Sequence, residues 1–344
     1  MNIHTRANID PLDSYGLIAC ELARHLCRAG VNTNIVSLGK RDMPHQAADI
    51  AEIVSQPVEP SEGGIFLGWP TNYHKYDVKP GRRIALTMHE STKIPAGWAE
   101  VLNEMDAVIT PARFSKRVLQ EGGVTAPIHV VPLGIGEVFQ PHYRKQDQDR
   151  PFTFLAFADR GDRKNFHAAE QAFVRAFGRS MKYRLLLKAR SIGAKHLNPL
   201  NPNIDIIYQD MSEQELYELY CSCDCLVFPS RGEGWGFPPR EAAATGLPVI
   251  ATNWSGLADD IDVWGIPLDY EMVTAEWRDV LPFRGQDLGQ WAEPSIDHLT
   301  ELMKCVVEMN TLYRLRAHQA ARSMHSLYSW SKLAAFTYDL WRGN

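Results

Sequence analysis

The feature that most constrains the fold is an alternation, through nearly the whole chain, of short apolar runs with segments of helical periodicity. Apolar runs of strand length separated by helices are typical of βαβ units, in which helices cover both faces of a parallel sheet. The alternation therefore predicts an α/β fold. In the first half, strands are expected at Met1–His4, Asn34–Leu38, Ile65–Gly68, Arg83–Met88, Ala107–Thr110 and His129–Val131, and helices at Ser14–Ala29, Gly97–Asn103 and Ser115–Glu121.

A chain of 344 residues has the length of two domains. The stretch from Leu133 to Pro151 is rich in Gly, Pro and charge without sustained periodicity, which indicates a linker. A second α/β set follows it, so we expect two domains of similar size, at 1–140 and 141–325. Its strands are expected at Phe152–Ala156, Arg184–Lys188, Asp205–Ile207, Cys225–Phe228 and Pro248–Ala251, and its helices at Phe166–Phe177, Glu213–Cys221 and Pro239–Thr245.

The segment after Tyr270 is less regular. We interpret Trp291-Ala292-Glu293-Pro294 as a turn, and leave Trp277 and Trp291 without a functional role because aromatic residues are more often packing groups. Two helices are expected beyond this turn, around Ile296–Met309 and from Ser331 to Trp341.

Charge and hydropathy limit the partners. Thirty-six Lys and Arg against 41 Asp and Glu give a net charge of −5, which supplies no general attraction to nucleic acid or to anionic membranes. No apolar run reaches the roughly 18 residues of a membrane-spanning helix, and the polar start lacks the layout of a secretory signal. We therefore expect a cytoplasmic protein without stable membrane insertion, and nucleic acid is not favoured as a partner.

Three of the six cysteines, Cys221, Cys223 and Cys225, lie together in CSCDC. A zinc cluster is the functional interpretation of such a group, but no second Cys or His pair lies nearby at metal-ligand spacing. No bound metal is expected.

The segment PSRGEGWGFPPREAAATG, from Pro229 to Gly246, follows an expected strand, at the end where open parallel sheets bind ligands. Gly232, Gly234 and Gly236 would let the backbone approach a ligand closely. The next helix would direct its N-terminal amides to the same place, which predicts a diphosphate site.

Two carboxylates flank this loop, Glu233 and Glu241, with seven residues between them. Because a phosphate would repel them, we expect them to accept hydrogen bonds from neutral hydroxyls of a sugar or ribose. The alternative is that Glu241 complements the helix dipole and that the glycines form a tight turn. The loop does not follow G-x-G-x-x-G and no segment matches the Walker pattern, which disfavours a nicotinamide enzyme or a P-loop ATPase.

The stretch PSRGEGWGFPPREAAATGLPVIATNWSGLADDI resembles the E-x7-E signature of the retaining GT-B glycosyltransferases of family GT4. VVPLGIGEVFQP resembles the interdomain linker of that family, FLAFADRGDRKNFHAAEQAF its first C-domain strand and basic loop, and YSWSKLAAFTYDLW its terminal helix. The resemblance implies two Rossmann-like domains facing a deep cleft, with the terminal helix, residues 326–344, crossing back to the N-terminal domain.

The resemblance also implies residue roles. Glu233 would contact the transferred sugar and Glu241 the nucleotide ribose. Lys164 would neutralise the leaving diphosphate, with Arg160 as its partner and Arg163 as the alternative partner. The loop backbone facing the donor would come from Gly234, Trp235, Gly236 and Phe237.

Two further candidates lie in the expected N-terminal domain. His89, in TMHEST at the end of an expected strand, resembles the family histidine that faces the sugar, although a single His is more often structural. Gly16, at the start of the first helix, resembles a family glycine near the diphosphate. The usual glycine pair is missing, because Tyr15 precedes Gly16.

The function implied is retaining transfer of a hexose-type sugar from a nucleotide diphosphate sugar to an acceptor hydroxyl, with neither metal nor cofactor. Asp-x-Asp occurs only at Asp147–Asp149 and Asp260–Asp262, neither at the end of a clear strand, so the metal-using GT-A class fits poorly. The acceptor could be a glycan, a lipid head group or a small molecule, with a modified phage DNA base as a minor alternative. A nucleotide-sugar epimerase or hydrolase of the same fold, and a non-catalytic nucleotide-sugar sensor, are the rival functions.

Overall fold

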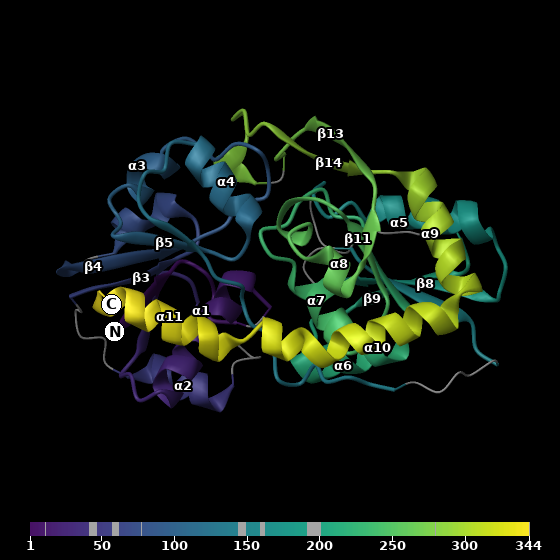
Figure 1. Ribbon diagram of the computed structural model, residues 1–344, viewed down its shortest axis with the longest axis horizontal. Coiled ribbons are helices and arrows are strands. Elements are labelled where there is room, and N and C mark those ends of the chain that lie inside the picture. The colour runs from purple at the N-terminus through teal and green to yellow at the C-terminus, as the bar shows by residue number, and fades with distance from the viewer. Residues whose placement is uncertain are drawn as a thin grey trace. The chain divides into compact units, whose positions relative to one another are not determined.

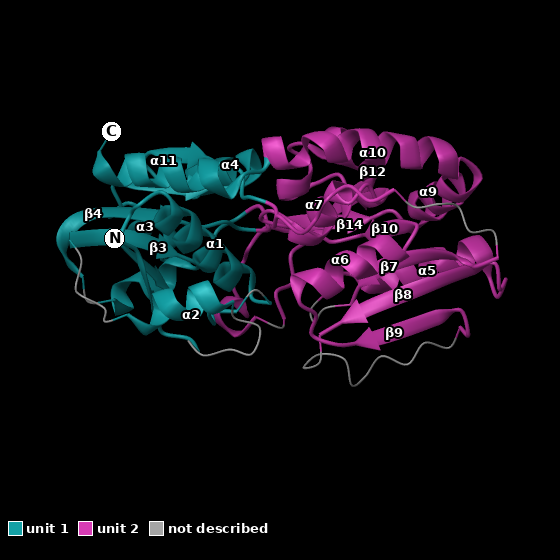
Figure 2. Cartoon of the chain, turned by 90° about the horizontal axis from the view of Figure 1, so that it is seen from below, with its two compact units in different colours: residues 1–89, 93–134, 328–344 teal, residues 90–92, 135–327 magenta. Residues whose placement is uncertain are grey.

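The computed structural model describes residues 1–10, 12–40, 47–56, 62–76, 78–143, 149–158, 162–190, 201–278 and 280–343. The chain forms two compact units (Figure 2). Unit 1 consists of Met1–His89, Lys93–Gly134 and Tyr328–Asn344, and unit 2 of Glu90–Thr92 and Ile135–Leu327. The main change of unit after Gly134 falls inside the expected linker, whereas the short segment Glu90–Thr92 is part of unit 2 and not of the first unit.

Unit 1 is built on a parallel sheet of six strands in the order β2-β1-β3-β4-β5-β6. Its strands are β1 (Asn2–Thr5), β2 (Asn34–Ser37), β3 (Glu62–Leu67), β4 (Lys79–Leu86), β5 (Ala107–Thr110) and β6 (Ile128–Val130). Its α-helices are α1 (Ser14–Arg28), α2 (Ala48–Ser55), α3 (Trp98–Leu102), α4 (Arg113–Glu121) and α11 (Trp330–Arg342). Strand residues such as Ile3, Ile65 and Ile84 are fully buried, as expected for a parallel sheet with covered faces.

The last helix of the chain, α11, lies in unit 1 and packs against α1 and β4 (Figure 1). Its buried residues include Leu333 and Ala334. The chain therefore ends on the unit in which it begins, as the GT4 resemblance implied.

The start of α1 is capped by Asp13, whose carboxylate accepts hydrogen bonds from the backbone amides of Tyr15 and Gly16 at 3.0 and 3.3 Å.

Unit 2 contains a second parallel sheet of six strands, in the order β12-β11-β10-β7-β8-β9. Its strands are β7 (Phe152–Phe157), β8 (Tyr183–Ala189), β9 (Ile204–Tyr208), β10 (Cys225–Phe228), β11 (Val249–Thr252) and β12 (Ile266–Leu268), and its α-helices are α5 (Phe166–Phe177), α6 (Glu213–Ser222), α7 (Phe237–Ala244), α8 (Ile261–Trp264), α9 (Ile296–Glu308) and α10 (Asn310–Leu327). The strand order reverses between β7 and β10, so the segments that follow these two strands leave the sheet side by side. The predicted α/β class is confirmed.

One sequence prediction in this unit was wrong. Trp291-Ala292-Glu293-Pro294 is not a turn but part of strand β14 (Gln290–Pro294), which pairs antiparallel with β13 (Tyr270–Thr274). A short connecting turn is the usual local signal of a hairpin. Here the two strands are joined by a long segment, so nothing next to Trp291 in the sequence marks its partner.

Three α-helices have no counterpart in the predicted pattern: α2, the short α8 and α10. In α10 the buried side chains are Ala317, Ala321 and Met324, while Leu312 and Leu315 are exposed. Such mixing of apolar residues between the two faces weakens the helical hydrophobic period.

Among the described residues, no helix is long and apolar enough to cross a membrane.

Candidate active site

The glycine-rich loop follows β10 at the carboxyl end of the unit 2 sheet and leads directly into α7. At Gly232 a Cβ atom would overlap the carbonyl oxygen of Glu90, and at Gly256 a Cβ would overlap the carbonyl oxygen of Gly234. Gly236, immediately before α7, has φ +82, in the left-handed region that favours glycine. The loop is therefore packed so closely that only glycine fits at these points.

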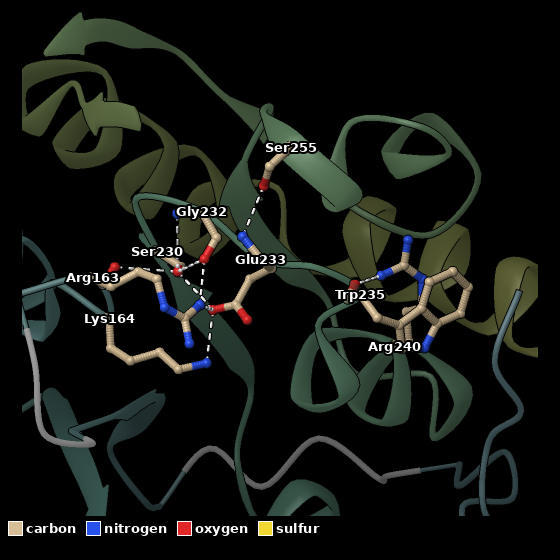
Figure 3. A network of polar contacts seen from close by, with 8 residues as sticks. All are labelled: Arg163, Lys164, Ser230, Gly232, Glu233, Trp235, Arg240 and Ser255. Atoms are coloured by element: carbon tan, nitrogen blue, oxygen red, sulfur yellow. Dashed lines mark hydrogen bonds and ion pairs between the residues drawn. The ribbon is translucent and has the colours of Figure 1, made fainter. Parts of the chain in front are cut away.

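Glu233 lies at the centre of this loop and faces two cations (Figure 3). Its Oε1 accepts hydrogen bonds from Lys164 Nζ and Ser230 Oγ, each at 2.7 Å, and lies 3.0 Å from Arg163 Nη1. Its Oε2 accepts no hydrogen bond from the described residues. One carboxylate oxygen is thus fixed by the protein and the other is open to a ligand donor.

Charge dominates the ionisation of Glu233. Burial by itself would raise the pKa of this carboxyl, but the charges of Arg163 and Lys164, with hydrogen bonds from Lys164 and Ser230, lower the pKa to about 2. Glu233 is therefore ionised at neutral pH. Lys164 and Arg163 set two positive charges against Glu233, and two adjacent cations suit a site for a diphosphate. The buried carboxyl of Glu90 also interacts with these three charges, and burial raises its pKa.

Glu241 lies in α7 and is buried. Its Oε2 accepts a hydrogen bond from the hydroxyl of buried Tyr220 at 3.1 Å. Burial, helped by the negative charge of Glu213, raises the pKa of Glu241 to about 8, although the Tyr220 hydrogen bond and the charge of Lys188 act in the opposite direction. The two glutamates of the motif therefore differ in charge at neutral pH.

The backbone of Trp235 is held by Arg240, a residue that the sequence analysis did not single out. Arg240 is fully buried, with its guanidinium 3.7 Å from the ring centroid of Trp235 and 5.1 Å from that of Trp264. It donates hydrogen bonds to the carbonyl oxygen of Trp235, to Gly256 O at 2.9 Å and to Asp260 Oδ1 at 2.5 Å. In the sequence, these contacts of Arg240 are marked only by the presence of an arginine within an Ala- and Pro-rich helix.

Replacing Arg240 by leucine is expected to lower the free energy of unfolding by about 3–5 kcal/mol, the usual cost of breaking a buried ion pair. The reason is that two carbonyl oxygens and Asp260 would lose their cationic donor together. Urea unfolding measures this change. Arg175→Leu is the matched control, because Arg175 pairs with Asp297 on the surface and should cost below about 1 kcal/mol; equal losses in the two variants would contradict the role of Arg240.

Of the other candidates from the sequence, one contacts Glu233, one lies outside the described residues and two lie in unit 1. Arg163, the alternative partner of Lys164, contacts Glu233, whereas Arg160 lies outside the described residues. His89 lies in unit 1, where it is buried with its ring edge-on to Trp98 at 5.3 Å. Gly16 also lies in unit 1, and a Cβ there would overlap the carbonyl oxygen of Asn8, so close packing requires a glycine at this position.

The remaining loop candidates lie where they were expected. Gly234, Trp235 and Gly236 are within the loop before α7, and Phe237 is the first residue of that helix. The six cysteines are free thiols, and in the described part of the chain no three His, Cys, Asp or Glu side chains converge as metal ligands.

Part of unit 2 is similar to a known protein family. Residues 159–274 match the family model described as glycosyl transferases group 1. This segment of the chain is similar to the group 1 glycosyltransferases. The residues clustered at Glu233, together with Arg240 and Glu241, lie inside the matched segment, so the resemblance to this family stated from the sequence is confirmed.

A named glycosyltransferase and a solved structure are also similar to this chain. D-inositol 3-phosphate glycosyltransferase of Paenarthrobacter aurescens is 28% identical over 252 residues, which make up 68% of this chain and 56% of that protein. The chain thus spans about half of that relative. Sucrose-phosphate synthase from Thermosynechococcus elongatus has the same fold, with a TM-score of 0.72, 14% identity, and coverage of 100% of this chain and 98% of that one.

A third similar protein is Anabaena HepE, whose structure was solved in complex with UDP-glucose. Its TM-score is 0.68 at 11% identity, and the alignment covers 98% of this chain and 99% of that chain. Likeness over nearly the full length of these two solved structures confirms the predicted GT-B fold.

Proposed function

We propose that the chain transfers a hexose-type sugar from a nucleotide diphosphate sugar to an acceptor hydroxyl, with retention of the anomeric configuration and without a resident metal or cofactor. The observation that carries this proposal is the Glu233 cluster. Lys164 and Arg163 supply positive charge against Glu233, three residues before the N-cap of α7, while Glu233 keeps one carboxylate oxygen open.

The charges of the cluster match those of the reaction. As the bond between sugar and diphosphate breaks, negative charge grows on the departing diphosphate and the sugar becomes oxocarbenium-like. Lys164, Arg163 and the backbone amides at the start of α7 would stabilise the negative charge. Glu233 Oε2 would accept a hydrogen bond from a sugar hydroxyl and hold the ring in place, and its negative charge would favour the developing cation.

The relatives support the choice of substrates. HepE was solved with UDP-glucose, and a curated relative is named as a glycosyltransferase acting on D-inositol 3-phosphate. We infer a nucleotide sugar as the donor and a hydroxyl-bearing glycan, lipid head group or small molecule as the acceptor, with nucleic acid not favoured.

The test is incubation of the protein with UDP-, GDP- and ADP-sugars, each with and without a panel of acceptors and each with and without EDTA. Release of nucleoside diphosphate together with an α-linked product from an α-linked donor, unaffected by EDTA, is the expected result. Donor consumption without acceptor would instead identify an epimerase or hydrolase. Tight donor binding with no release would identify a sensor, and loss of turnover in EDTA would contradict the absence of a metal.

Nucleotide affinity should rise with pH through ionisation of Glu241. With a pKa of about 8 in the free protein, roughly one molecule in ten carries the ionised carboxylate at pH 7 and about nine in ten do at pH 9. If ribose hydroxyls donate to that carboxylate, the Kd of UDP should fall about tenfold over this range. Isothermal titration at several pH values measures it, and Glu241→Gln should remove the dependence. The same slope in Glu241→Gln would contradict the ribose role.

A further inference from the structure

Glu293 lies outside the glycine-rich motif, in β14, yet both of its carboxylate oxygens contact residues next to the Glu233 cluster. Its Oε1 accepts a hydrogen bond from Asn165 Nδ2 at 3.0 Å, and its Oε2 accepts one from Arg231 Nε at 2.5 Å. Asn165 directly follows Lys164, and Arg231 lies two residues before Glu233. One carboxylate therefore connects the segment that carries the cations with the loop that carries the acid.

The same two segments are also joined by hydrogen bonds of Arg231 around this carboxylate. Arg231 donates its backbone amide to Arg163 O at 2.7 Å and its Nη1 to the carbonyl oxygen of Asp162. The backbone amide of Ala292, next to Glu293, donates to Arg231 O at 3.0 Å. The hairpin of β13 and β14 is thus bonded directly to the glycine-rich loop, and that loop is bonded to the cation segment.

The backbone conformation of Asn165 shows why this support matters. Asn165 has φ +47 and ψ +42, a left-handed conformation, at the position just before α5. Asparagine enters this region more readily than other non-glycine residues, and surrounding contacts still help to hold it there. Glu293 binds the Asn165 side chain, so it stabilises the turn that orients Lys164 toward Glu233.

We propose that Glu293 is a positioning residue for the transfer reaction: by binding Asn165 and Arg231 together, it sets the place of the Lys164 ammonium and the Arg163 guanidinium against Glu233. This inference rests on the proposed function in so far as those cations bind the diphosphate. It also gives the β13 and β14 hairpin a role in the active site.

If Glu293 only stabilised the fold, its loss would lower the stability of the chain. The Glu293 side chain is 36% exposed and that of Arg231 is 20% exposed, and ion pairs of this kind add little to stability. Loss of Glu293 should therefore leave folding nearly unchanged and act on the geometry of the cations. A small displacement of a catalytic group is enough to slow a reaction by about 10- to 100-fold.

The test compares Glu293→Ala with Glu271→Ala, in which the directly opposite residue of the hairpin is changed. Glu271 is exposed. We expect Glu293→Ala to lower kcat about 10- to 100-fold and to weaken UDP binding, with a melting temperature close to that of the native chain. Glu271→Ala should leave all three unchanged. Glu293→Gln, which can still accept from Asn165 but carries no charge for Arg231, should fall between the two.

A coupling experiment separates positioning from other effects. In a Lys164→Ala, Arg163→Ala background, Glu293→Ala should cause no further loss of UDP affinity, because it acts through the two cations. A crystal structure of Glu293→Ala should show that Lys164 Nζ has moved away from Glu233 Oε1. Additive losses, or an unmoved Lys164 with unchanged kcat, would overturn the proposal. A native chain that neither binds UDP nor consumes donors would overturn the proposed function instead, while the crystal structure would still decide whether Glu293 positions Lys164.

Discussion

Replacing Lys164 by alanine is expected to slow release of nucleoside diphosphate by about 10²–10³-fold, the usual effect of removing one donor that stabilises developing negative charge. The ammonium lies 2.7 Å from Glu233 Oε1, and only 16% of the side chain is exposed. Water in the space left by the side chain would not supply an oriented positive charge. Steady-state kinetics with saturating donor measure the effect.

UDP binding should weaken in the same variant, because Lys164 attracts the diphosphate both before and after the sugar leaves. Lys182→Ala is the control, since Lys182 is an exposed lysine of the same unit. Both variants remove one positive charge, so general electrostatic attraction is matched between them. If Lys182→Ala reduced turnover as much as Lys164→Ala, the specific role of Lys164 would be ruled out.

Replacing Glu233 by glutamine is expected to reduce donor turnover at least about 100-fold while leaving the fold intact. Glutamine keeps a carbonyl oxygen that can accept from Ser230 Oγ, which now donates to Glu233 Oε1 at 2.7 Å. Its amide group, however, would offer a hydrogen-bond donor in place of the open Oε2 acceptor. The negative charge that faces the developing oxocarbenium ion would also be lost.

The affinity for UDP should change in the opposite direction from that of Lys164→Ala. Glu233 neutralises part of the charge of Lys164 and Arg163, so its removal leaves more positive charge for the diphosphate, and UDP should bind as tightly or more tightly. Glu218→Gln, an exposed site on α6, serves as the control for the change of net charge. Full turnover in Glu233→Gln, or weaker UDP binding, would contradict the proposed role.

The sequence predicts well those helices and strands whose pattern of apolar residues lies within the segment itself. Strand β5 at Ala107–Thr110 and helix α5 at Phe166–Phe177 have the predicted bounds, because buried apolar runs and helical periods are set within each segment. Glu233 was singled out because its glycine-rich loop follows an expected strand, and Lys164 through the resemblance to family GT4. The ion pair between them was not predicted.

The parts that could not be predicted depend on distant partners. The role of Arg240 in holding the loop depends on its contacts with Trp235, Trp264 and Asp260, which only the structure shows. Glu293 was assigned to a turn because its hairpin partner and its two hydrogen-bond donors are far away in the sequence. Burial of a charge and long-range pairing leave no periodic signal in one sequence.

The order of strands in the second sheet affects which insertions and deletions this chain can accept during evolution. Lys164 follows β7 and Glu233 follows β10, and these strands are neighbours in the sheet although the two residues are 69 positions apart. The chain between them runs out through β8 to β9 at the border of the sheet and returns. Insertions or deletions in that excursion would lengthen or shorten the protein without separating the two charges, so lineages could remodel this border while conserving the reaction.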